Sequence, residues 1–276
     1  MERHRHPELV IFILLMMVLW LKADLEITLY CPARTLGWNS ARSYCRSTYQ
    51  DLVTWDIVDV EYMTKWLRNE RFMTVWIGLQ EDPDQAFVWK WINLKTGEGV
   101  TGENLSASSN WALESSVTGS CGSYSYTTPK KWHKTVCSTL LPFICFDDNL
   151  VVVTENMTWE DALSYCRKMT TSSYRYDLLS LTNLSDSSYI SNRIYRTTTE
   201  EVWIGLRFLG GKWWWPDGQM TNSEMMLPDC PSQLRRCGVL SKNETGHWIT
   251  RDCSESRNFI CSRTKVVTST KDEEIL

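Results

Sequence analysis

Apolar and polar positions between residues 158 and 166 follow the period of an α-helix. Four apolar residues recur at i, i+3, i+4 and i+7 and so share one face: Trp159, Ala162, Leu163 and Cys166. Thr158 stands where an N-cap residue would, and Asp161 follows three residues later, in the place where a capping box has Glu. The pattern predicts a helix over 159–166, and the run 38–45, which also ends in cysteine, predicts another.

Shorter apolar runs predict the strands. Opening strands are expected around 26–30 and 150–154. The tetrad Trp-Ile-Gly-Leu occurs at 76–79 and again at 203–206, and it predicts a buried strand in which glycine marks a close approach of backbone. The remaining expected elements are aromatic strands at 87–91 and 213–215 and helices near 59–69 and 185–196.

These elements occur twice in the same order, and the cysteines repeat with them. Cys121 and Cys137 are 16 residues apart, the second copy repeats this interval, and each copy reaches its last cysteine 8 residues later. Chance does not reproduce both intervals with the same flanking residues, so the chain contains an internal duplication. The predicted organisation is two domains and a polar tail, at 25–146, 150–263 and 264–276.

Ten cysteines in a chain of 276 residues indicate an oxidising compartment and a framework of disulfides. The N-terminus agrees, because a basic stretch precedes an apolar run at 9–21 and the small residue Ala23. A run of 13 residues is short for a membrane span, so we expect a signal peptide at 1–23 and a secreted protein. A type II membrane anchor through 9–21 is the alternative. Four sequons are expected at the surface as glycosylation sites: Asn104, Asn156, Asn183 and Asn243.

Charge and histidine content argue against two classes of function. The formal net charge is −4, and loss of residues 1–23, with three basic and two acidic residues, would leave about −5. Such a chain offers no basic patch for nucleic acid or heparin, so nucleic acid is not an expected partner. Beyond residue 23 the histidines are His133 and His247, and neither stands in a metal-ligand spacing or a nucleophile motif. We therefore do not expect an enzyme.

The features above resemble the C-type lectin-like domain, twice over, in a tandem layout similar to fish mannose-receptor-like proteins and other secreted C-type lectins. The matching features are the helix that ends in cysteine, the Trp-Ile-Gly-Leu tetrad, the Cys-Gly pair, the tryptophan before the third cysteine (Trp132, Trp248) and the final Phe-Ile-Cys. The resemblance covers roughly 25–263. It implies an α+β fold in which each domain is a small disulfide-stapled mixed sheet with two helices and a long loop.

The resemblance also implies a disulfide pairing, which spacing alone leaves open among three connectivities in each domain. The implied disulfides are Cys45–Cys145, Cys121–Cys137, Cys166–Cys261 and Cys237–Cys253. Two cysteines, Cys31 and Cys230, have no partner in this scaffold. They could pair with each other, remain thiols or crosslink two chains, and a covalent dimer through Cys230 is one hypothesis.

Sugar-binding members of this family hold Ca²⁺ with oxygens from a Glu-Pro-Asn or Gln-Pro-Asp tripeptide in the long loop and from Trp-Asn-Asp before the third cysteine. The first domain departs from both motifs. Its loop keeps only Glu114, followed by Ser116, and its second motif reads Trp132-His133-Lys134. An ammonium has no lone pair and repels the ion. We expect Lys134 to take the place of the cation and to pair with Glu114.

The second domain departs from the calcium motifs in other positions. Its loop reads Leu227-Pro228-Asp229, and its second motif, Trp248-Ile249-Thr250, supplies one apolar residue and one hydroxyl. Asp229, Thr250 and Asp252 are too few oxygen ligands for a sensor-like calcium affinity. No cofactor or metal is therefore expected in either domain. The candidate ligand-binding residues of these degraded sites are Glu114, Ser116, His133, Lys134, Leu227, Asp229, Ile249 and Thr250.

Sugar recognition without calcium stays open, because an exposed tryptophan can stack on a pyranose ring. Trp111 and Trp213 are the candidates, although tryptophan in small domains more often fills the core. The expected function is that of a secreted, non-catalytic recognition protein that binds a glycan or a protein, as relatives do in innate defence. The alternative is an oligomerising protein-interaction module similar to the snaclecs, with no glycan ligand.

Overall fold

The structure, a computed structural model, describes residues 25–266 apart from 59, 71–72, 113–118, 126–130, 182–186, 222–226, 228–230, 233 and 244–248. The chain divides into two compact units. The first unit comprises Glu26–Asn149 and Ser188–Arg196, and the second comprises Leu150–Ser187 and the residues from Thr197 onward. The predicted signal peptide and most of the predicted tail lie outside the described residues. No helix in the described part is long and apolar enough to cross a membrane.

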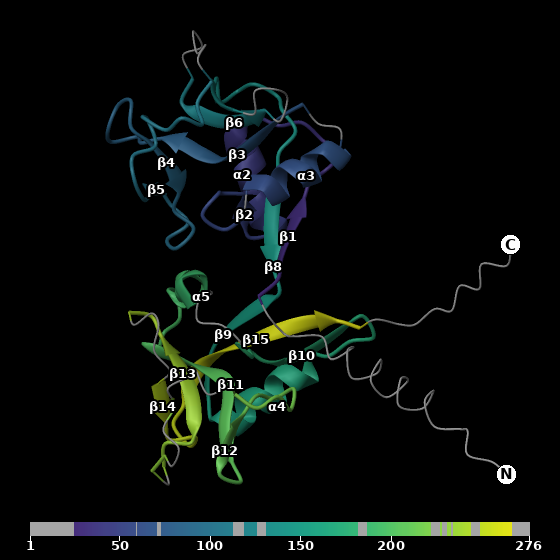
Figure 1. Cartoon of the computed structure of the whole chain (residues 1–276), viewed down its shortest axis with the longest axis vertical. Coiled ribbons are helices and arrows are strands. Elements are labelled where there is room, and N and C mark those ends of the chain that lie inside the picture. Colours follow the sequence, from purple (N-terminus) through teal and green to yellow (C-terminus); the bar gives the residue numbers. More distant parts are fainter. Residues whose placement is uncertain are drawn as a thin grey trace, which may run out of the picture. The chain divides into compact units, whose positions relative to one another are not determined.

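The first unit contains two antiparallel sheets, with strand orders β1-β8-β2 and β5-β4-β3-β6-β7 (Figure 1). The first sheet consists of β1 (Ile27–Tyr30), β2 (Asp51–Leu52) and β8 (Cys145–Asp148). The second consists of β3 (Thr74–Glu81), β4 (Trp89–Ile92), β5 (Val100–Thr101), β6 (Cys121–Ser125) and β7 (Lys131–Thr135). Its helices are α2 (Trp38–Thr48), α3 (Val60–Glu70) and most of α5 (Ser187–Ile194).

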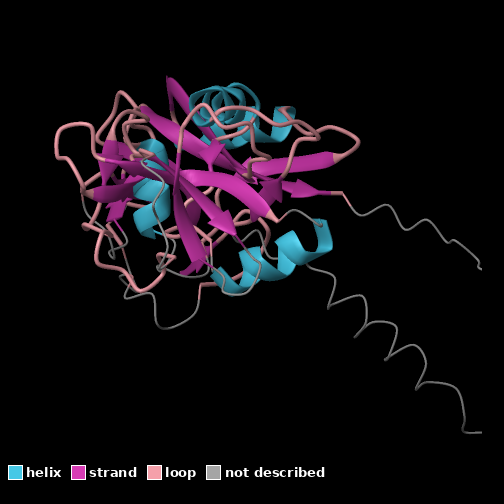
Figure 2. Ribbon diagram, turned by 90° about the horizontal axis from the view of Figure 1, so that it is seen from above, coloured by secondary structure: helices cyan, strands magenta, loops and turns pink. Residues whose placement is uncertain are grey.

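The second unit contains one mixed sheet, with the order β10-β15-β11-β13-β14. Figure 2 shows the strands of the chain in magenta and the helices in cyan. Strand β12 pairs with β11, β9 pairs with β15, and the pair β11–β15 is parallel. The strands are β9 (Leu150–Met157), β10 (Tyr174–Leu178), β11 (Glu201–Leu209), β12 (Lys212–Trp214), β13 (Cys237–Ser241), β14 (Ile249–Arg251) and β15 (Arg257–Lys265). Helix α4 (Trp159–Lys168) completes the unit. The predicted α+β fold with disulfide-stapled domains is confirmed.

The two units differ in sheet continuity near the last buried phenylalanine, and they also differ in the residue that precedes it. Asn258, just before Phe259, has a backbone N–H that donates to Thr199, and β15 runs without a break past it. Proline occupies the corresponding place in the first unit, as Pro142, and it has no N–H to donate to a ladder. There the two sheets meet only in an isolated parallel bridge between Trp76 and Phe143.

Helix α4 begins where the pattern predicted. The Oγ1 of Thr158 accepts the backbone N–H of Asp161 at 3.3 Å and donates to its Oδ2 at 2.8 Å, which satisfies one of the free donors of the first turn. The aromatic strand of the first unit begins later than predicted, at Trp89 rather than residue 87. Phe87 has a positive φ of 65° and lies in the turn before β4, where its N–H donates to Glu81 Oε1.

The same arrangement of two tryptophans occurs in each core. Trp38 at the start of α2 donates its indole N–H to the carbonyl of Ile77 at 2.8 Å, and Trp159 at the start of α4 does the same to Ile204. Trp76 and Trp203, from the two tetrads, are 0% exposed and donate back to Leu36 and Met157. Each buried indole thus has its one donor satisfied while its ring fills the core.

The tetrad glycines are required by close packing. An added Cβ at Gly78 would lie 2.7 Å from Cγ2 of Thr54, and one at Gly205 would lie 2.4 Å from the ring of Pro216. The predicted close approach is therefore present, but its nearest atoms belong to side chains rather than to backbone.

Four disulfides join the strands and helices within the units. They are Cys45–Cys145, Cys121–Cys137, Cys166–Cys261 and Cys237–Cys253, the pairing that the resemblance implied. In each unit the long disulfide ties the first helix to the last strand. The short one ties the start of β6 or β13 to a cysteine two residues after the end of the paired strand, β7 or β14. All four cysteines of the long disulfides are 0% exposed.

Candidate functional site

Strand β7 places Lys134 over two tryptophan rings. Lys134 pairs with Gly122 of β6, where an added Cβ would lie 2.5 Å from the Cβ of Leu79. The Nζ of Lys134 lies 5.7 Å from the ring centroid of Trp89 and 5.6 Å from that of Trp111. Both distances lie within the reach of a cation–π attraction. The expected partner, Glu114, lies outside the described residues, as does Ser116.

Trp111 is held in place by contacts on several sides. Its indole N–H donates to the carbonyl of Leu105 at 2.7 Å, and its ring meets Trp89 and Trp132 edge-on at centroid distances of 4.9 and 5.5 Å. Backbone hydrogen bonds between Trp132 and the residues on either side of Trp111 fasten the start of the long loop to β7. Trp111 remains half-buried, so part of its surface faces solvent beside the Lys134 ammonium.

Trp213 has the environment of a core residue. It is 6% exposed, and its ring centroid lies 5.1 Å from that of Phe208. A sugar ring could not stack on it without displacing these neighbours. Of the two tryptophans considered for stacking, only Trp111 offers accessible surface.

The described half of the calcium motif in the first unit does not supply oxygen ligands of the usual kind. Ca²⁺ takes six to eight oxygen ligands, whereas the motif before the third cysteine supplies the imidazole of His133 and the ammonium of Lys134. The Lys134 ammonium already makes cation–π contacts with the rings of Trp89 and Trp111. Among the residues that the structure describes, no three His, Cys, Asp or Glu side chains converge as a metal site would require.

His133 is half-buried in β7, opposite the buried Ser123. Burial lowers the pKa of His133, because the charged imidazolium loses hydration there. The imidazole is therefore neutral at physiological pH. Neither metal binding nor proton transfer is indicated by its surroundings, where Ser123 and Thr135 bond each other at 2.8 Å.

Acidification should destabilise the first unit through His133. In the unfolded chain a histidine titrates near pH 6.5, above the lowered pKa of the folded state, so the unfolded chain takes up the proton first. The free energy of unfolding is therefore unaffected by this group above about pH 6.5 and falls as the pH drops below it. Urea unfolding between pH 7.5 and 5 should show a smaller loss for His133→Gln than for the wild type. Equal losses in the two proteins would contradict this role.

In the second unit the corresponding strand, β14, carries Ile249, Thr250 and Arg251. Arg251 reaches Glu201 at the start of β11, with its Nε 2.9 Å from Oε2 and an Nη2 contact to Oε1. The Nη1 of Arg251 also donates to the carbonyl of Thr250 at 3.1 Å. Ile249 and Thr250 are each half-buried. The strand thus carries an ion pair at the residue directly after the two positions where the family motif would carry calcium ligands.

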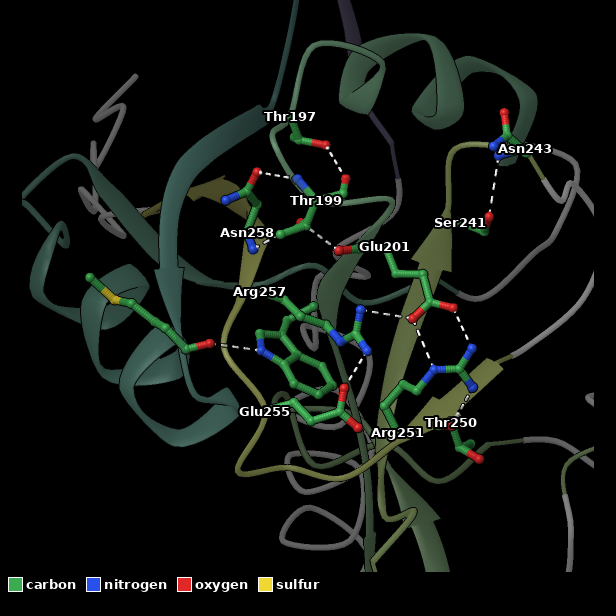
Figure 3. A network of polar contacts seen from close by, with 12 residues as sticks. Thr197, Thr199, Glu201, Ser241, Asn243, Thr250, Arg251, Glu255, Arg257 and Asn258 are labelled. Atoms are coloured by element: carbon green, nitrogen blue, oxygen red, sulfur yellow. Dashed lines mark hydrogen bonds and ion pairs between the residues drawn. The ribbon is translucent and has the colours of Figure 1, made fainter.

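A second arginine shares the same carboxylate. Figure 3 shows Glu201 between Arg251 and Arg257, and the Nη1 of Arg257 lies 2.9 Å from Glu201 Oε2. Arg257 also contacts Glu255, and its guanidinium lies 5.6 Å from the ring centroid of Trp203. Glu201 is 12% exposed, so the pairing is only partly screened by water.

Asn258 holds the segment that leads into Glu201. Its side chain is 0% exposed, and its Oδ1 accepts the backbone N–H groups of Thr198 at 2.6 Å and Thr199 at 3.2 Å. Its Nδ2 donates to the carbonyl of Thr154 in β9 at 2.8 Å. Thr199 in turn donates to the carbonyl of Glu201 at 2.7 Å. The buried amide thus positions the start of β11, and with it the carboxylate.

None of the site residues predicted from the sequence was Glu201, Arg251 or Arg257. Arg251 directly follows the candidate Thr250, but its charge gave no sign of a partner. Glu201 lies 50 positions away in the chain, and the strand order β11-β13-β14 is what brings the two side chains together.

The structure describes only some of the oxygen ligands considered for calcium in the second unit. Asp229 and Trp248 lie outside the described residues, and Leu227 is half-buried. Asp252 is engaged in a turn, where its Oδ1 accepts the backbone N–H of Ser254 at 3.0 Å and its hydroxyl at 2.9 Å. These hydrogen bonds lower the pKa of Asp252. Thr250 remains as the described acceptor, which is too little for Ca²⁺.

The sequons and the remaining cysteines are only partly described. Asn104, Asn156 and Asn243 are exposed, as a glycosylated asparagine must be, and Asn183 lies outside the described residues. Cys31 is half-buried after β1, and Cys230 lies outside the described residues. Glycosylation and a covalent dimer through Cys230 therefore stay predictions.

Comparison with known proteins gives matches along most of the chain. The Secretory phospholipase A2 receptor of Oryctolagus cuniculus is 23% identical over 267 residues, 83% of this chain and 17% of the receptor. C-type mannose receptor 2 of Homo sapiens is 32% identical over 112 residues, 39% of this chain and 7% of that receptor. Snaclec 3 of Daboia siamensis is 29% identical over 120 residues, 42% of this chain and 75% of the snaclec. The chain thus spans less than a fifth of the length of the receptors it matches.

The family assignment rests on two matches to one domain. The family model described as Lectin C-type domain matches residues 34–146 and again residues 155–263. The relatives are lectins and receptors, and no enzyme family is indicated. Because the two matches together cover well over half of the chain, the protein belongs to the C-type lectin domain family and carries two such domains in tandem.

Proposed function

We propose that this protein is a secreted, non-catalytic recognition protein whose first unit binds a glycan or protein ligand without calcium. The observation that carries the proposal is the Lys134 ammonium over the rings of Trp89 and Trp111. The family matches support a recognition role, since lectin domains bind glycans or proteins. Four disulfides support an extracellular setting, where such bonds persist.

A fixed ammonium opposes calcium at this place for an electrostatic reason. Two like unit charges 4 Å apart near a protein surface repel by about 4 kcal/mol, and a divalent ion doubles that figure. Lys134 is half-buried, so water screens its charge less than it would at a fully exposed position. A calcium ion in the neighbouring loop would have to overcome this repulsion with fewer oxygen ligands than it normally has.

The ammonium also replaces a structural role of the ion. In a calcium-dependent site the cation draws loop and strand together; here Lys134 on β7 attracts Trp111 at the start of the long loop. Such a contact contributes about 0.5–2 kcal/mol, depending on how far it is desolvated. The half-buried Trp111 and the adjacent cation then form a calcium-free surface that suits a sugar ring or a polar protein side chain.

Ligand binding in the presence and absence of EDTA tests the proposal. We expect the secreted protein to bind its targets on a glycan array, or a protein ligand, equally well in calcium and in EDTA. Lys134→Gln should weaken binding in both buffers by the same factor, because it removes the ammonium without creating a metal site. Lys65→Gln, an exposed charge on α3, is the matched control and should bind like the wild type.

Binding that requires calcium and is competed by free sugar would contradict the proposal. Absence of glycan binding together with binding to a protein would assign the surface to a protein ligand. Absence of both, in a protein that self-associates in sedimentation, would favour the oligomerising module instead.

A further inference from the structure

A second feature of the first unit has a different chemistry from the long-loop end and shares no residue with it. A cavity of about 130 Å³ lies between the end of α2, the turn that joins β4 to β5, and α5. Four cationic side chains are among the residues that line it: Arg46 from α2, Lys95 from the turn, and Arg193 and Arg196 from α5 and its end. This concentration of positive charge stands out in a chain whose net charge is −4.

The carboxylates near the cavity already have partners. Asp51, which also lines it, lies 3.2 Å from the Nε of Arg42. Asp148, whose side chain is 0% exposed, lies 2.6 Å from the Nε of Arg193 and also accepts the hydroxyl of Tyr189 at 2.6 Å. Arg42 and Arg193 are thus the arginines in direct contact with these two acids, and Arg46 interacts with Asp51 through its charge without a direct ion pair.

Three cations of the cavity form no such direct ion pair with either acid. Within the described part of the chain, Arg46, Lys95 and Arg196 take part in none of the ion pairs. Lys95 lies over the ring of Tyr195, with its Nζ 4.6 Å from the centroid, and Arg196 donates to the carbonyl of Thr96. Neither contact neutralises a charge, so the charges of Lys95 and Arg196 stay unpaired beside Arg46 at the cavity. All three residues are exposed, so water screens part of the repulsion among them.

From this arrangement we infer that the cavity is a binding site for a single oxyanion, a sulfate or phosphate group, free or carried as an ester. A tetrahedral oxyanion accepts several charge-assisted hydrogen bonds at once, and guanidinium groups match its geometry with two parallel N–H donors. The bound anion would replace mutual repulsion among Arg46, Lys95 and Arg196 with attraction to each of them.

The size of the cavity sets the class of ligand. Pockets that bury drug-sized molecules measure about 300–1,000 Å³, so a cavity of about 130 Å³ accommodates one charged group rather than a whole sugar. A sulfated sugar would therefore insert its sulfate and leave its ring outside. The absence of a large basic patch, which argued against heparin and nucleic acid, does not bear on a site for one group.

Thermal unfolding with sulfate at constant ionic strength tests this site. Sodium sulfate, compared with sodium chloride, should raise the Tm of the wild type along a saturable curve, as expected when a ligand binds only the folded state. The double variant Arg46→Gln with Arg196→Gln should bind sulfate at least tenfold more weakly. The matched control, Lys65→Gln with Arg68→Gln on α3, removes the same charge from exposed positions outside the cavity and should bind like the wild type.

Isothermal titration with N-acetylglucosamine 6-sulfate, N-acetylglucosamine and inorganic phosphate separates the sources of the anion. Binding of the sulfated sugar but not of its neutral parent supports an ester ligand, and binding of the inorganic ions alone supports a free anion. A sulfate effect that does not saturate, or one that is equal in the cavity and control variants, overturns the inference. Lys95→Gln provides the same comparison should the double variant fail to fold, since Lys95 is exposed.

Discussion

Replacing Cys45 and Cys145 together with alanine should lower the free energy of unfolding of the first unit by about 4.7 kcal/mol, the chain-entropy value for a loop of about 100 residues. This disulfide closes a loop with a sequence separation of 100 and connects α2 to the central strand of the β1-β8-β2 sheet. Both cysteines are 0% exposed, so the substitution also leaves a small space in a packed core. The loss should appear in urea unfolding followed by tryptophan fluorescence.

The short disulfide of the same unit is the internal control. Cys121 and Cys137 are separated by only 16 residues, for which the same model gives about 3 kcal/mol. Both disulfides belong to the first unit, so the difference in the free energy of unfolding between the two double variants measures the effect of loop length. A loss for Cys121→Ala with Cys137→Ala that equals or exceeds the loss for the long disulfide would show that strain or packing, not loop entropy, sets the stability.

Replacing Glu201 with glutamine should destabilise the second unit by about 2–3 kcal/mol, because two arginines would lose their shared anion. The side chains of Arg251 and Arg257 are 30% and 17% exposed, so water compensates them only in part. Glutamine keeps the size of the side chain and can still accept one hydrogen bond. The change therefore isolates the charge rather than the packing.

Glu200→Gln is the matched control for this charge. Glu200 is the preceding residue and is exposed, and its carboxylate accepts one hydrogen bond, from Asn243 Nδ2 at 3.2 Å. Its substitution should change stability by less than about 0.5 kcal/mol. Guanidinium or urea unfolding of the two variants compares them directly. If both lose the same amount, the network around Glu201 contributes no more than a surface charge.

The elements of the fold could be predicted because local spacing determines them. The i, i+3, i+4, i+7 pattern from Trp159 to Cys166 gave α4, and the structure extends that helix by two residues to Lys168. The tetrads gave β3 and β11, each with its Trp buried. Phe87 was misassigned because an aromatic residue favours strands in general, whereas its backbone lies in a turn with positive φ. The strand propensity of a residue type does not indicate a positive φ at one position.

The candidate sites could be predicted only in part. The sequence placed Lys134 where a calcium ligand would stand, because its offset from Cys137 is readable along the chain. It suggested Glu114 as the partner of the ammonium, whereas the described contacts are to Trp89 and Trp111. Trp89 lies 45 residues before Lys134, and no local pattern links the two. Strands β4 and β7 are separated by β3 and β6 in the sheet, so the contact between Trp89 and Lys134 depends on the tertiary fold and not on the pairing of neighbouring strands.

By itself the sequence determined that this protein consists of two copies of one disulfide-stapled domain, because periodicity and cysteine spacing are properties of neighbouring positions. It also determined that the calcium motifs are incomplete, because ligand chemistry is a property of residue type. The tertiary structure alone decided which charges meet. Arg251 reaches Glu201 across the sheet, and Arg46, Lys95 and Arg196 line one cavity. Electrostatic interaction depends on distance in space and on burial, and neither can be read from a sum of charges along the chain.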